Sequence, residues 1–353
     1  MMQGAVLNQP MGYSYLEAKY EGLSRRLPRL PLGDFPTPIS KLDERLWIKR
    51  DDFTHIVYGG NKLRKLEYLL GDANVRGCDG VVTFGGVGSN HALATALHSR
   101  NVDLDCTCVL MRQRMTDFVE TTLQRHQRNA TALVAWPDNR AGRVAQMRGL
   151  RDAMPQSLAV LPLGGTSPLG SIGYVNAAFE LAAQWREATP PERIYVAAGT
   201  MGTAAGLAVG LDLLGWPTRV IAVRVTAKSQ VNRRAMDKLC AKISRRLHQA
   251  DGTIAYRPTA AQRVDIRDSF FGDDYAHATA ESIAAVAHAK QAWSLPLETT
   301  YTGKAMACLL DDLRTTQSQS PWLFWHTYNG RPAGYRPALN DDYSAFLSLC
   351  SSD

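Results

Sequence analysis

Apolar and polar positions follow two alternating periods along most of the chain. From Gly80 onwards, short apolar runs such as VVTF, LDCTCVLM and ALVAW alternate with segments whose apolar residues stand three and four positions apart. The runs are typical of buried strands, and the segments are typical of helices. The same alternation resumes with RIYVAA and TRVIAVRV and ends with WLFWHT. Strands that take turns with helices predict an α/β protein with parallel sheets.

The periodic segments also give the expected positions of the helices. We expect helices near residues 91–100, 118–127, 143–153, 175–187, 203–214, 232–248, 281–291 and 304–313. Residues 1–24 show little periodicity, so we expect them to lie on the surface. Residues 161–174 carry four glycines and two prolines, which is typical of a crossover between domains or an active-site loop.

The stretch YGGNKLRKLEYLL, from Tyr58 to Leu70, predicts a loop followed by an amphipathic helix. At about 100° per residue, Lys62 falls within the leucine stripe of this helix, and Arg64 is expected on the opposite side. Burial disfavours the ammonium form, so an inward lysine tends towards a nucleophilic neutral amine, as in Schiff-base lysines. The alternative is a lysine that extends from the helix start to water.

Two glycine-rich loops follow predicted strands. The loop AAGTMGTAAG, residues 197–206, predicts either a phosphate-binding helix start or a plain tight turn. The loop GGVGSNHA, residues 85–92, offers Ser89 and Asn90 either to a ligand or as helix caps. Neither loop fits a dinucleotide or Walker A fingerprint.

Composition narrows the classes of function. The net charge of +7 suggests anionic ligands, but the basic residues of 232–248 lie mostly outside an apolar stripe, and no nucleic-acid motif accompanies them. The six cysteines show no zinc spacing and no compact disulfide framework, so no metal is expected. The chain has no membrane-length apolar run and no export signal. We therefore expect a cytoplasmic protein that contacts neither nucleic acid nor membrane.

A buried lysine, an anion site and hydroxyl-rich loops together match the needs of pyridoxal phosphate. The motifs YGGNKLRKLEY, SNHA, GTMGTAAG, YTGKAM and HT-x-x-G, with LPLGDFPTP before them, resemble the family of 1-aminocyclopropane-1-carboxylate deaminase and D-cysteine desulfhydrase. The resemblance runs in matching order from about Leu30 to Gly334. It implies a tryptophan-synthase-β-like, fold type II pyridoxal-phosphate enzyme with two parallel-sheet α/β domains and the cofactor between them. The implied large domain is 1–66 plus 174–353, and the implied small domain is 67–173.

The resemblance also implies roles for individual residues. Lys62 would bind the cofactor covalently, Lys65 would reach its phosphate and Asn90 would bond the ring hydroxyl. The implied catalytic residues are Lys62, Ser89, Tyr275 and Tyr301. The implied cofactor-binding residues are Lys62, Lys65, Asn90, Gly199, Thr200, Met201, Gly202, Thr203, Thr302 and Thr327. The implied substrate-binding residues are Ser89, Asn90, His91, Tyr275 and Tyr301.

The chain departs from the family pattern at several positions. Thr302 stands where the deaminases have glutamate, as in the desulfhydrases, and is expected to support a less protonated cofactor ring. Gly88, Met201, Tyr328 and Asn329 also replace family residues. The threonine favours α,β-elimination of a small D-cysteine-like amino acid to a keto acid and ammonia, and the resemblance implies a homodimer.

Other interpretations remain open from the sequence. They are ring-opening deamination of the cyclopropane amino acid, racemisation or dehydration of a hydroxy amino acid, a non-catalytic cofactor or amino-acid binding protein, and a nucleotide-phosphate binding module.

Overall fold

The computed structural model describes residues 12–129, 131–137, 139–153, 157–331 and 338–352. The chain divides into two compact units. The first unit comprises residues 12–68 and 166–331, and the second comprises the described residues of 69–165 together with 338–352.

The sheet of the first unit has its strands in the order β1-β2-β11-β8-β9-β10. The strands are β1 Ile39–Lys41, β2 Leu46–Arg50, β8 Arg193–Ala198, β9 Arg219–Arg224, β10 Val264–Arg267 and β11 Trp322–His326. β1 is antiparallel to β2, and the other neighbouring pairs are parallel. From β8 the chain continues outward to β9 and β10, whereas β11 lies on the other side of β8. The strand order therefore reverses between β8 and β11, and ligands of open α/β sheets bind at the carboxyl ends of strands at such a point.

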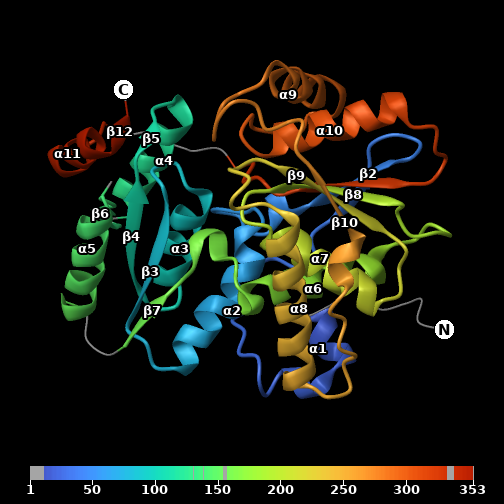
Figure 1. The fold of residues 1–353 in the computed structure, drawn as a ribbon, viewed down its shortest axis with the longest axis horizontal. Helices are drawn as coiled ribbons and strands as arrows, with labels where there is room; N and C mark the ends of the chain where they lie inside the picture. The colour runs from blue at the N-terminus through green and yellow to red at the C-terminus, as the bar shows by residue number, and fades with distance from the viewer. Residues whose placement is uncertain (1–11, 130, 138, 154–156, 332–337, 353) are drawn as a thin grey trace. The chain divides into compact units, whose positions relative to one another are not determined.

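Helices cover both faces of this sheet (Figure 1). α9 Ala280–Trp293 and α10 Thr302–Thr315 lie on one face, and α6 Pro168–Gln184, α7 Gly202–Leu213 and α8 Arg233–Ala250 lie on the other. The remaining helical elements of this unit are α1 Tyr15–Lys19, α2 Lys62–Val75 and the 3-10 turns η1 Glu21–Leu23, η2 Asp51–Phe53 and η4 Ala260–Arg263. α2 begins in the first unit and ends in the second.

α6 and α7 approach each other closely because α7 carries a glycine at every fourth position. A Cβ on Gly206 would lie 2.3 Å from the carbonyl oxygen of Ser171, and a Cβ on Gly210 would lie 2.6 Å from the Cβ of Ala178. Only glycine avoids both clashes, so the backbone of α6 lies directly on α7. This contact brings the start of α6 beside the start of α7.

The second unit is built on a parallel sheet with the order β6-β4-β3-β7. Its strands are β3 Gly80–Gly86, β4 Asp105–Met111, β6 Ala132–Ala135 and β7 Leu158–Val160, and a separate pair joins β5 Gln113–Arg114 to β12 Ser351–Ser352. Its helical elements are α3 Asn90–Arg100, α4 Asp117–Arg128, α5 Arg140–Ala153, η3 Leu163–Gly165 and α11 Asp341–Cys350. The parallel α/β architecture predicted from the sequence is confirmed.

The division into units differs from the predicted domains in one respect. Residues 338–352 were expected with the large domain, but they belong to the second unit. Phe346 of α11 lies in the same apolar cluster as Cys108 and Leu123, and β12 pairs with β5. The other boundaries fall at 68/69 and 165/166 rather than at 66/67 and 173/174.

One expectation about local structure is confirmed and another was wrong. Residues 161–174 contain the boundary between the two units at 165/166, as a crossover between domains does, and α6 then begins at Pro168, where Ser167 Oγ accepts from the N–H of Gly170. Residues 12–24 do not merely cover the surface, because Leu16 and Leu23 are fully buried. Of the helices in the described ranges, none has the length and apolar character needed to cross a bilayer.

Candidate active site

Lys62 is the first residue of α2. Its Nζ donates to Oδ1 of Asn61 at 2.9 Å. Burial lowers the pKa of Lys62 to about 8, and the nearby carboxylate of Glu298 acts in the opposite sense. The residue as a whole is half-buried. The structure therefore holds an amine of which about one tenth is neutral at pH 7.

The loop before Lys62 is tied to the chain that follows β11. The N–H of Asn61 donates to the carbonyl oxygen of Thr327 at 3.0 Å, and the N–H of Gly59 donates to Oδ1 of Asn329 at 2.9 Å. Gly60 has a φ of +98°, and a Cβ there would lie 2.9 Å from the same oxygen of Thr327. Asn329, which the sequence showed only as a departure from the family, thus fixes the approach to Lys62.

Residues 199–203 lie at the carboxyl end of β8 and lead into α7. Met201 has a left-handed φ of +65° and stands at the cap position of α7. Thr203 Oγ1 accepts from Nδ2 of Asn61 at 3.1 Å, which joins this loop to the residue before Lys62. The predicted loop and the predicted lysine are therefore adjacent in the structure.

Polar groups converge on Gly202, the first residue of α7. A Cβ there would lie 2.6 Å from Thr166 Oγ1, 2.9 Å from Lys65 Nζ and 3.0 Å from Ser171 Oγ. Thr166 Oγ1 also lies 2.6 Å from Thr200 Oγ1 and 3.3 Å from Lys65 Nζ. Ser171 Oγ is fully buried and has no hydrogen-bond partner within the described ranges. We call Lys65, Thr166, Ser171, Thr200 and Gly202 the anion cup.

The anion cup and Lys62 fit pyridoxal phosphate. Hydroxyls, a lysine and the N-terminus of α7 suit a phosphate, and the hydroxyl of Ser171 offers it a further donor. Burial, together with the charge of Lys62, lowers the pKa of Lys65 well below its usual value, and a bound anion would favour its protonated form. Lys62 supplies the amine that the cofactor's aldehyde requires.

Two tyrosines meet beside the loop 199–203. The hydroxyl groups of Tyr275 and Tyr301 are hydrogen-bonded to each other, and their rings meet edge to face with centroids 6.3 Å apart. Cε1 of Tyr301 would lie 3.5 Å from a Cβ on Gly199. Burial raises the pKa of both phenols, so both hold their protons at neutral pH. Each phenol can therefore donate a proton.

Thr302 Oγ1 has its single proton engaged. Oγ1 lies 2.9 Å from Oε1 of Glu298, and the N–H of Glu298 donates to Oγ1 at 3.1 Å. Between a hydroxyl and a carboxylate, only the hydroxyl can donate. The proton of Thr302 Oγ1 is therefore directed to Glu298, and the oxygen itself can act only as an acceptor.

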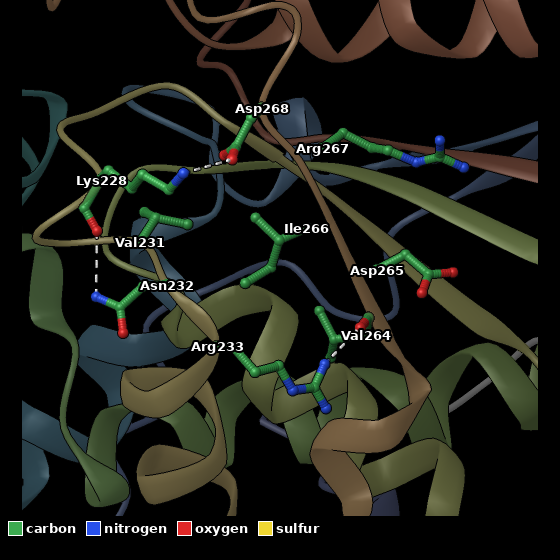
Figure 2. A pocket seen from close by; sticks show the side chains of 9 residues that line it. All are labelled: Lys228, Val231, Asn232, Arg233, Val264, Asp265, Ile266, Arg267 and Asp268. Carbon is green, nitrogen blue, oxygen red and sulfur yellow. Dashed lines mark hydrogen bonds and ion pairs between the residues drawn. The ribbon is translucent and has the colours of Figure 1, made fainter.

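A surface pocket of the first unit lies elsewhere, beside the start of α8 and strand β10 (Figure 2). It is lined by Lys228, Val231, Asn232, Arg233, Val264, Asp265, Ile266, Arg267 and Asp268. Lys228 pairs with Asp268 at 3.7 Å, and Arg233 donates to the carbonyl oxygen of Val264 at 2.9 Å. This lining contains none of the predicted site residues.

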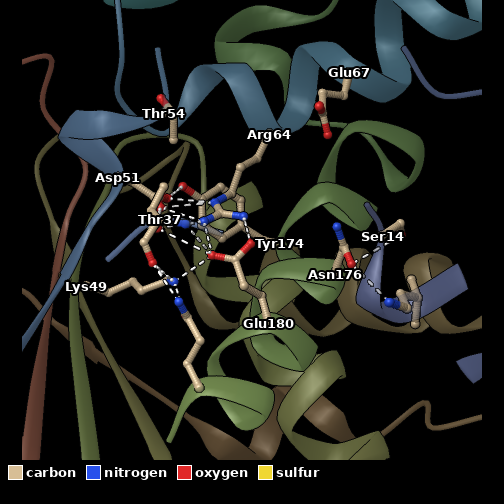
Figure 3. A network of polar contacts seen from close by, with 12 residues as sticks. Ser14, Thr37, Lys49, Asp51, Thr54, Arg64, Glu67, Tyr174, Asn176 and Glu180 are labelled. Carbon is tan, nitrogen blue, oxygen red and sulfur yellow. Dashed lines mark hydrogen bonds and ion pairs between the residues drawn. The ribbon is translucent and has the colours of Figure 1, made fainter. Parts of the chain in front are cut away.

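A buried ion network holds the start of α2 in place (Figure 3). Arg64 is 1% exposed and donates to the carboxylates of Asp51 and Glu180. Lys49 Nζ donates to Glu180 at 2.5 Å, and Tyr174 Oη donates to Asp51 at 2.7 Å. The expectation that Arg64 projects away from the interior is wrong, because these two carboxylates give its charge buried partners.

Ser89, Asn90 and His91 lie in the second unit. Ser89 Oγ caps α3 by accepting from the N–H of Ala92 at 3.2 Å, Asn90 is half-buried and His91 is buried. The N–H of Gly88 donates to Oε1 of Gln113 at 2.9 Å. The predicted loop therefore presents its polar side chains at a helix start, next to an amide from β5 that sequence reasoning missed.

Comparison with known proteins decides the family. A family model described as "Pyridoxal-phosphate dependent enzyme" matches residues 29–327. The chain belongs to this family. It is also 34% identical over 334 residues to D-cysteine desulfhydrases of Salmonella schwarzengrund (strain CVM19633) and Salmonella paratyphi A, covering 88% of this chain and 97% of each relative. The cofactor of this enzyme is pyridoxal phosphate.

Solved structures support the same fold. One described as an ACC deaminase homologue has a TM-score of 0.74 and 29% identity, covering 96% of this chain and 99% of the other. A fungal L-serine ammonia-lyase from Rhizomucor miehei has a TM-score of 0.58 and 17% identity, covering 84% of this chain and 94% of that chain, so it shows the fold alone. The fold is that of type II pyridoxal-phosphate enzymes, as the sequence predicted.

In the first unit the structure brings Lys62, Lys65, the loop 199–203 and the tyrosine pair into one neighbourhood. Sequence reasoning missed Thr166, Ser171 and Glu298. The first two stand in the segment GGTSPLGS, whose glycines predicted a loop. Glu298 stands four residues before Thr302, and an acidic residue just ahead of a helix start was a signal for it.

Proposed function

We propose that the enzyme is a lyase that eliminates the β-substituent of a small D-cysteine-like amino acid as sulfide, and that one water then converts the remaining enamine to a keto acid and ammonia. The observation that carries the proposal is a half-buried lysine of lowered pKa, Lys62, one helical turn from Lys65 of the anion cup. The relatives named D-cysteine desulfhydrase, which match over nearly their whole length, support the choice of substrate.

In the proposed reaction, pyridoxal phosphate, when bound, withdraws electrons from the α-carbon of the amino acid. Lys65, Thr166, Ser171 and Thr200 bind its phosphate in the anion cup. Lys62 would hold the cofactor covalently, and its Nζ, when free, would accept the α-proton of the substrate. The lowered pKa of Lys62 keeps part of the amine neutral for both tasks.

The tyrosine pair serves as the acid. Because the two hydroxyls are hydrogen-bonded, a proton donated by one phenol can be replaced from the other. The sulfur that leaves the β-carbon can take such a proton, and the raised pKa values mean that the phenols carry it at neutral pH. We also propose that Ser89, Asn90 and His91 contact the substrate and the cofactor. Thr302 and Thr327 are proposed contacts of the cofactor ring. The proposed working form is a cytoplasmic homodimer.

A second candidate is ring opening of 1-aminocyclopropane-1-carboxylate. The likeness to the structure described as an ACC deaminase homologue favours it. The hydrogen bond from Thr302 to Glu298 also favours it, since an acceptor suits a protonated ring.

The test is a panel assay on the enzyme purified with pyridoxal phosphate. Keto acid is measured from D-cysteine, L-cysteine, D-serine and the cyclopropane amino acid, and sulfide is measured in parallel. We expect keto acid and sulfide from D-cysteine, and loss of both in Lys62→Ala. The matched control is Lys228→Ala, which changes a lysine that is 78% exposed. Keto acid from the cyclopropane alone would decide for the second candidate, and cofactor binding with no product would indicate a non-catalytic binding protein.

A further inference from the structure

The carboxylate of Glu298 accepts hydrogen bonds from the backbone N–H groups at the start of α10. Its Oε2 accepts from the N–H of Thr300 at 2.8 Å, and its Oε1 accepts from those of Tyr301 at 3.0 Å and Thr302 at 2.6 Å. The first N–H groups of a helix have no partner within the helix, and its N-terminus favours a negative charge. Tyr301 stands at the cap position, but its own side chain does not cap the helix. The carboxylate of Glu298 therefore takes over the cap and fixes the backbone that carries Tyr301.

The charge of the same carboxylate also acts on the groups proposed for the chemistry. Its charge raises the pKa of Lys62 on α2, against the larger effect of burial. It adds to the effect of burial in raising the pKa of Tyr275 and, with Tyr275 and Tyr58, that of Tyr301. Burial lowers the pKa of Lys304 on α10, the carboxylate of Glu298 acts in the opposite sense, and Arg224 of β9 adds to the lowering. Burial raises the pKa of Glu298 itself, and the hydrogen bonds from Thr302, Tyr301 and Thr300 act in the opposite sense. Once ionised, this one carboxylate acts on the base and on both acids.

We propose that Glu298 is a positioning residue for the reaction, which holds Tyr301 at the start of α10 and supplies the negative charge that faces Lys62. The inference rests on the proposed function for the roles of these two residues. Glu298 accepts hydrogen bonds from the backbone N–H of Tyr301, whereas the phenol of Tyr301 is hydrogen-bonded to Tyr275. Glu298 therefore acts on Tyr301 through the helix start and through its charge.

Loss of the Glu298 carboxylate is expected to speed aldehyde capture by Lys62 and to slow substrate turnover. Without the charge, Lys62 gives up its proton more readily, so more neutral amine is present at neutral pH and the aldehyde is captured faster. Without the cap, Tyr301 is held less firmly, so turnover of substrate slows. A variant that was merely damaged would slow both.

The experiment compares Glu298→Gln, Glu298→Asp and Glu281→Gln. Glu281 is an exposed residue in the first turn of α9, so its variant makes the same change of charge at a neighbouring surface. The pKa of Lys62 is measured in the cofactor-free protein by competitive labelling of its amine across pH, with the modified peptide quantified by mass spectrometry. We expect Glu298→Gln to lower this pKa by roughly one pH unit and Glu281→Gln to leave it unchanged. No change in Glu298→Gln, or an equal change in both, would overturn the proposal.

The holoenzyme supplies the second readout. We expect the holoenzyme of Glu298→Gln to turn over its substrate about tenfold more slowly, with KM changed less than kcat. In the cofactor-free protein, we expect the same variant to capture pyridoxal faster at pH 7. Glu298→Asp keeps the charge but shortens the reach, so we expect a nearly unchanged pKa of Lys62 with a reduced kcat. If Glu298→Gln does not fold, Glu298→Asp decides, since unchanged kcat would contradict the positioning role. If the enzyme turns over no amino acid, the proposed function fails, while the labelling of Lys62 still tests the inference.

Discussion

Arg64 and Asp51 form a two-pronged ion pair inside the first unit. Nη2 of Arg64 lies 2.7 Å from Oδ1 of Asp51, and Nε lies 2.9 Å from Oδ2. Arg64 stands between Lys62 and Lys65 on α2, and its Nη1 donates to Oε2 of Glu180 on α6 at 2.9 Å. The pair therefore ties the helix that carries both lysines to η2 and to α6, the helix that contributes Ser171 to the anion cup.

Arg64→Met is expected to destabilise the protein strongly. Removing the guanidinium leaves the carboxylates of Asp51 and Glu180 buried with fewer partners, which costs about 3–5 kcal/mol of unfolding free energy. The measurement is the urea midpoint of the cofactor-free protein, read by far-UV circular dichroism. The control is Arg76→Met, which breaks an exposed pair with Asp72 and is expected to cost about 0.5 kcal/mol or less. Similar midpoints for the two variants would contradict the role of the network.

The reactivity of Lys62 is expected to follow its lowered pKa. Only the neutral amine attacks an aldehyde, and burial lowers the pKa to about 8, so about one tenth of Lys62 is reactive at pH 7. The rate of pyridoxal capture by the cofactor-free protein should rise about tenfold per pH unit below pH 8 and level off above it. Pyridoxal is the probe because it has no phosphate whose own titration would change the rate. A rate that continues to rise towards the ordinary lysine value of 10.5 would show that burial does not act on this amine.

The fold was predictable because each βα unit repeats the apolar pattern of a strand followed by that of a helix. Such a pattern shows which face of each element is buried. The anion cup was only half predictable. Residues 199–203 and Lys65 follow from loop and helix patterns, but Ser171 reaches the cup because Gly206 lets α6 approach α7. The sequence around a glycine does not show which other helix will pack against it.

The direction of Arg64 was mispredicted for a related reason. A helical period separates one face from another, but α2 is enclosed on several sides, and a charged residue can be buried wherever opposite charges meet it. Asp51 and Glu180, the carboxylates that enclose Arg64, stand 13 and 116 residues away along the chain. Pairing over such separations comes from tertiary structure and leaves no signal within one helix.

Gly202→Ala is expected to close the anion cup. The new Cβ would lie within 3.0 Å of polar atoms of Thr166, Lys65 and Ser171, where the phosphate is proposed to bind. We expect about a hundredfold weaker binding of pyridoxal phosphate, measured by titration of the cofactor-free protein. The control is Gly252→Ala, because a Cβ there would meet no described atom within 4 Å. Unchanged affinity in Gly202→Ala would place the phosphate elsewhere.

Ser171→Ala is expected to affect the cofactor-free and the cofactor-bound protein differently. The hydroxyl is buried without a partner among the residues described, so its removal is expected to leave the cofactor-free protein as stable as before or more stable. The same change removes a donor to the phosphate and should weaken binding of pyridoxal phosphate about tenfold. Thermal unfolding of the cofactor-free protein and cofactor titration measure the two effects.

Thr218→Val is the control for Ser171→Ala, because Thr218 carries another fully buried hydroxyl without a described partner, and it precedes β9 at the amino end of that strand. We expect this control to share the effect on stability and to leave the affinity unchanged. Pyridoxal, which lacks the phosphate, should bind Ser171→Ala as well as it binds the unaltered protein. If Ser171→Ala binds pyridoxal phosphate with full affinity, the hydroxyl of Ser171 does not contact the phosphate in the unaltered protein.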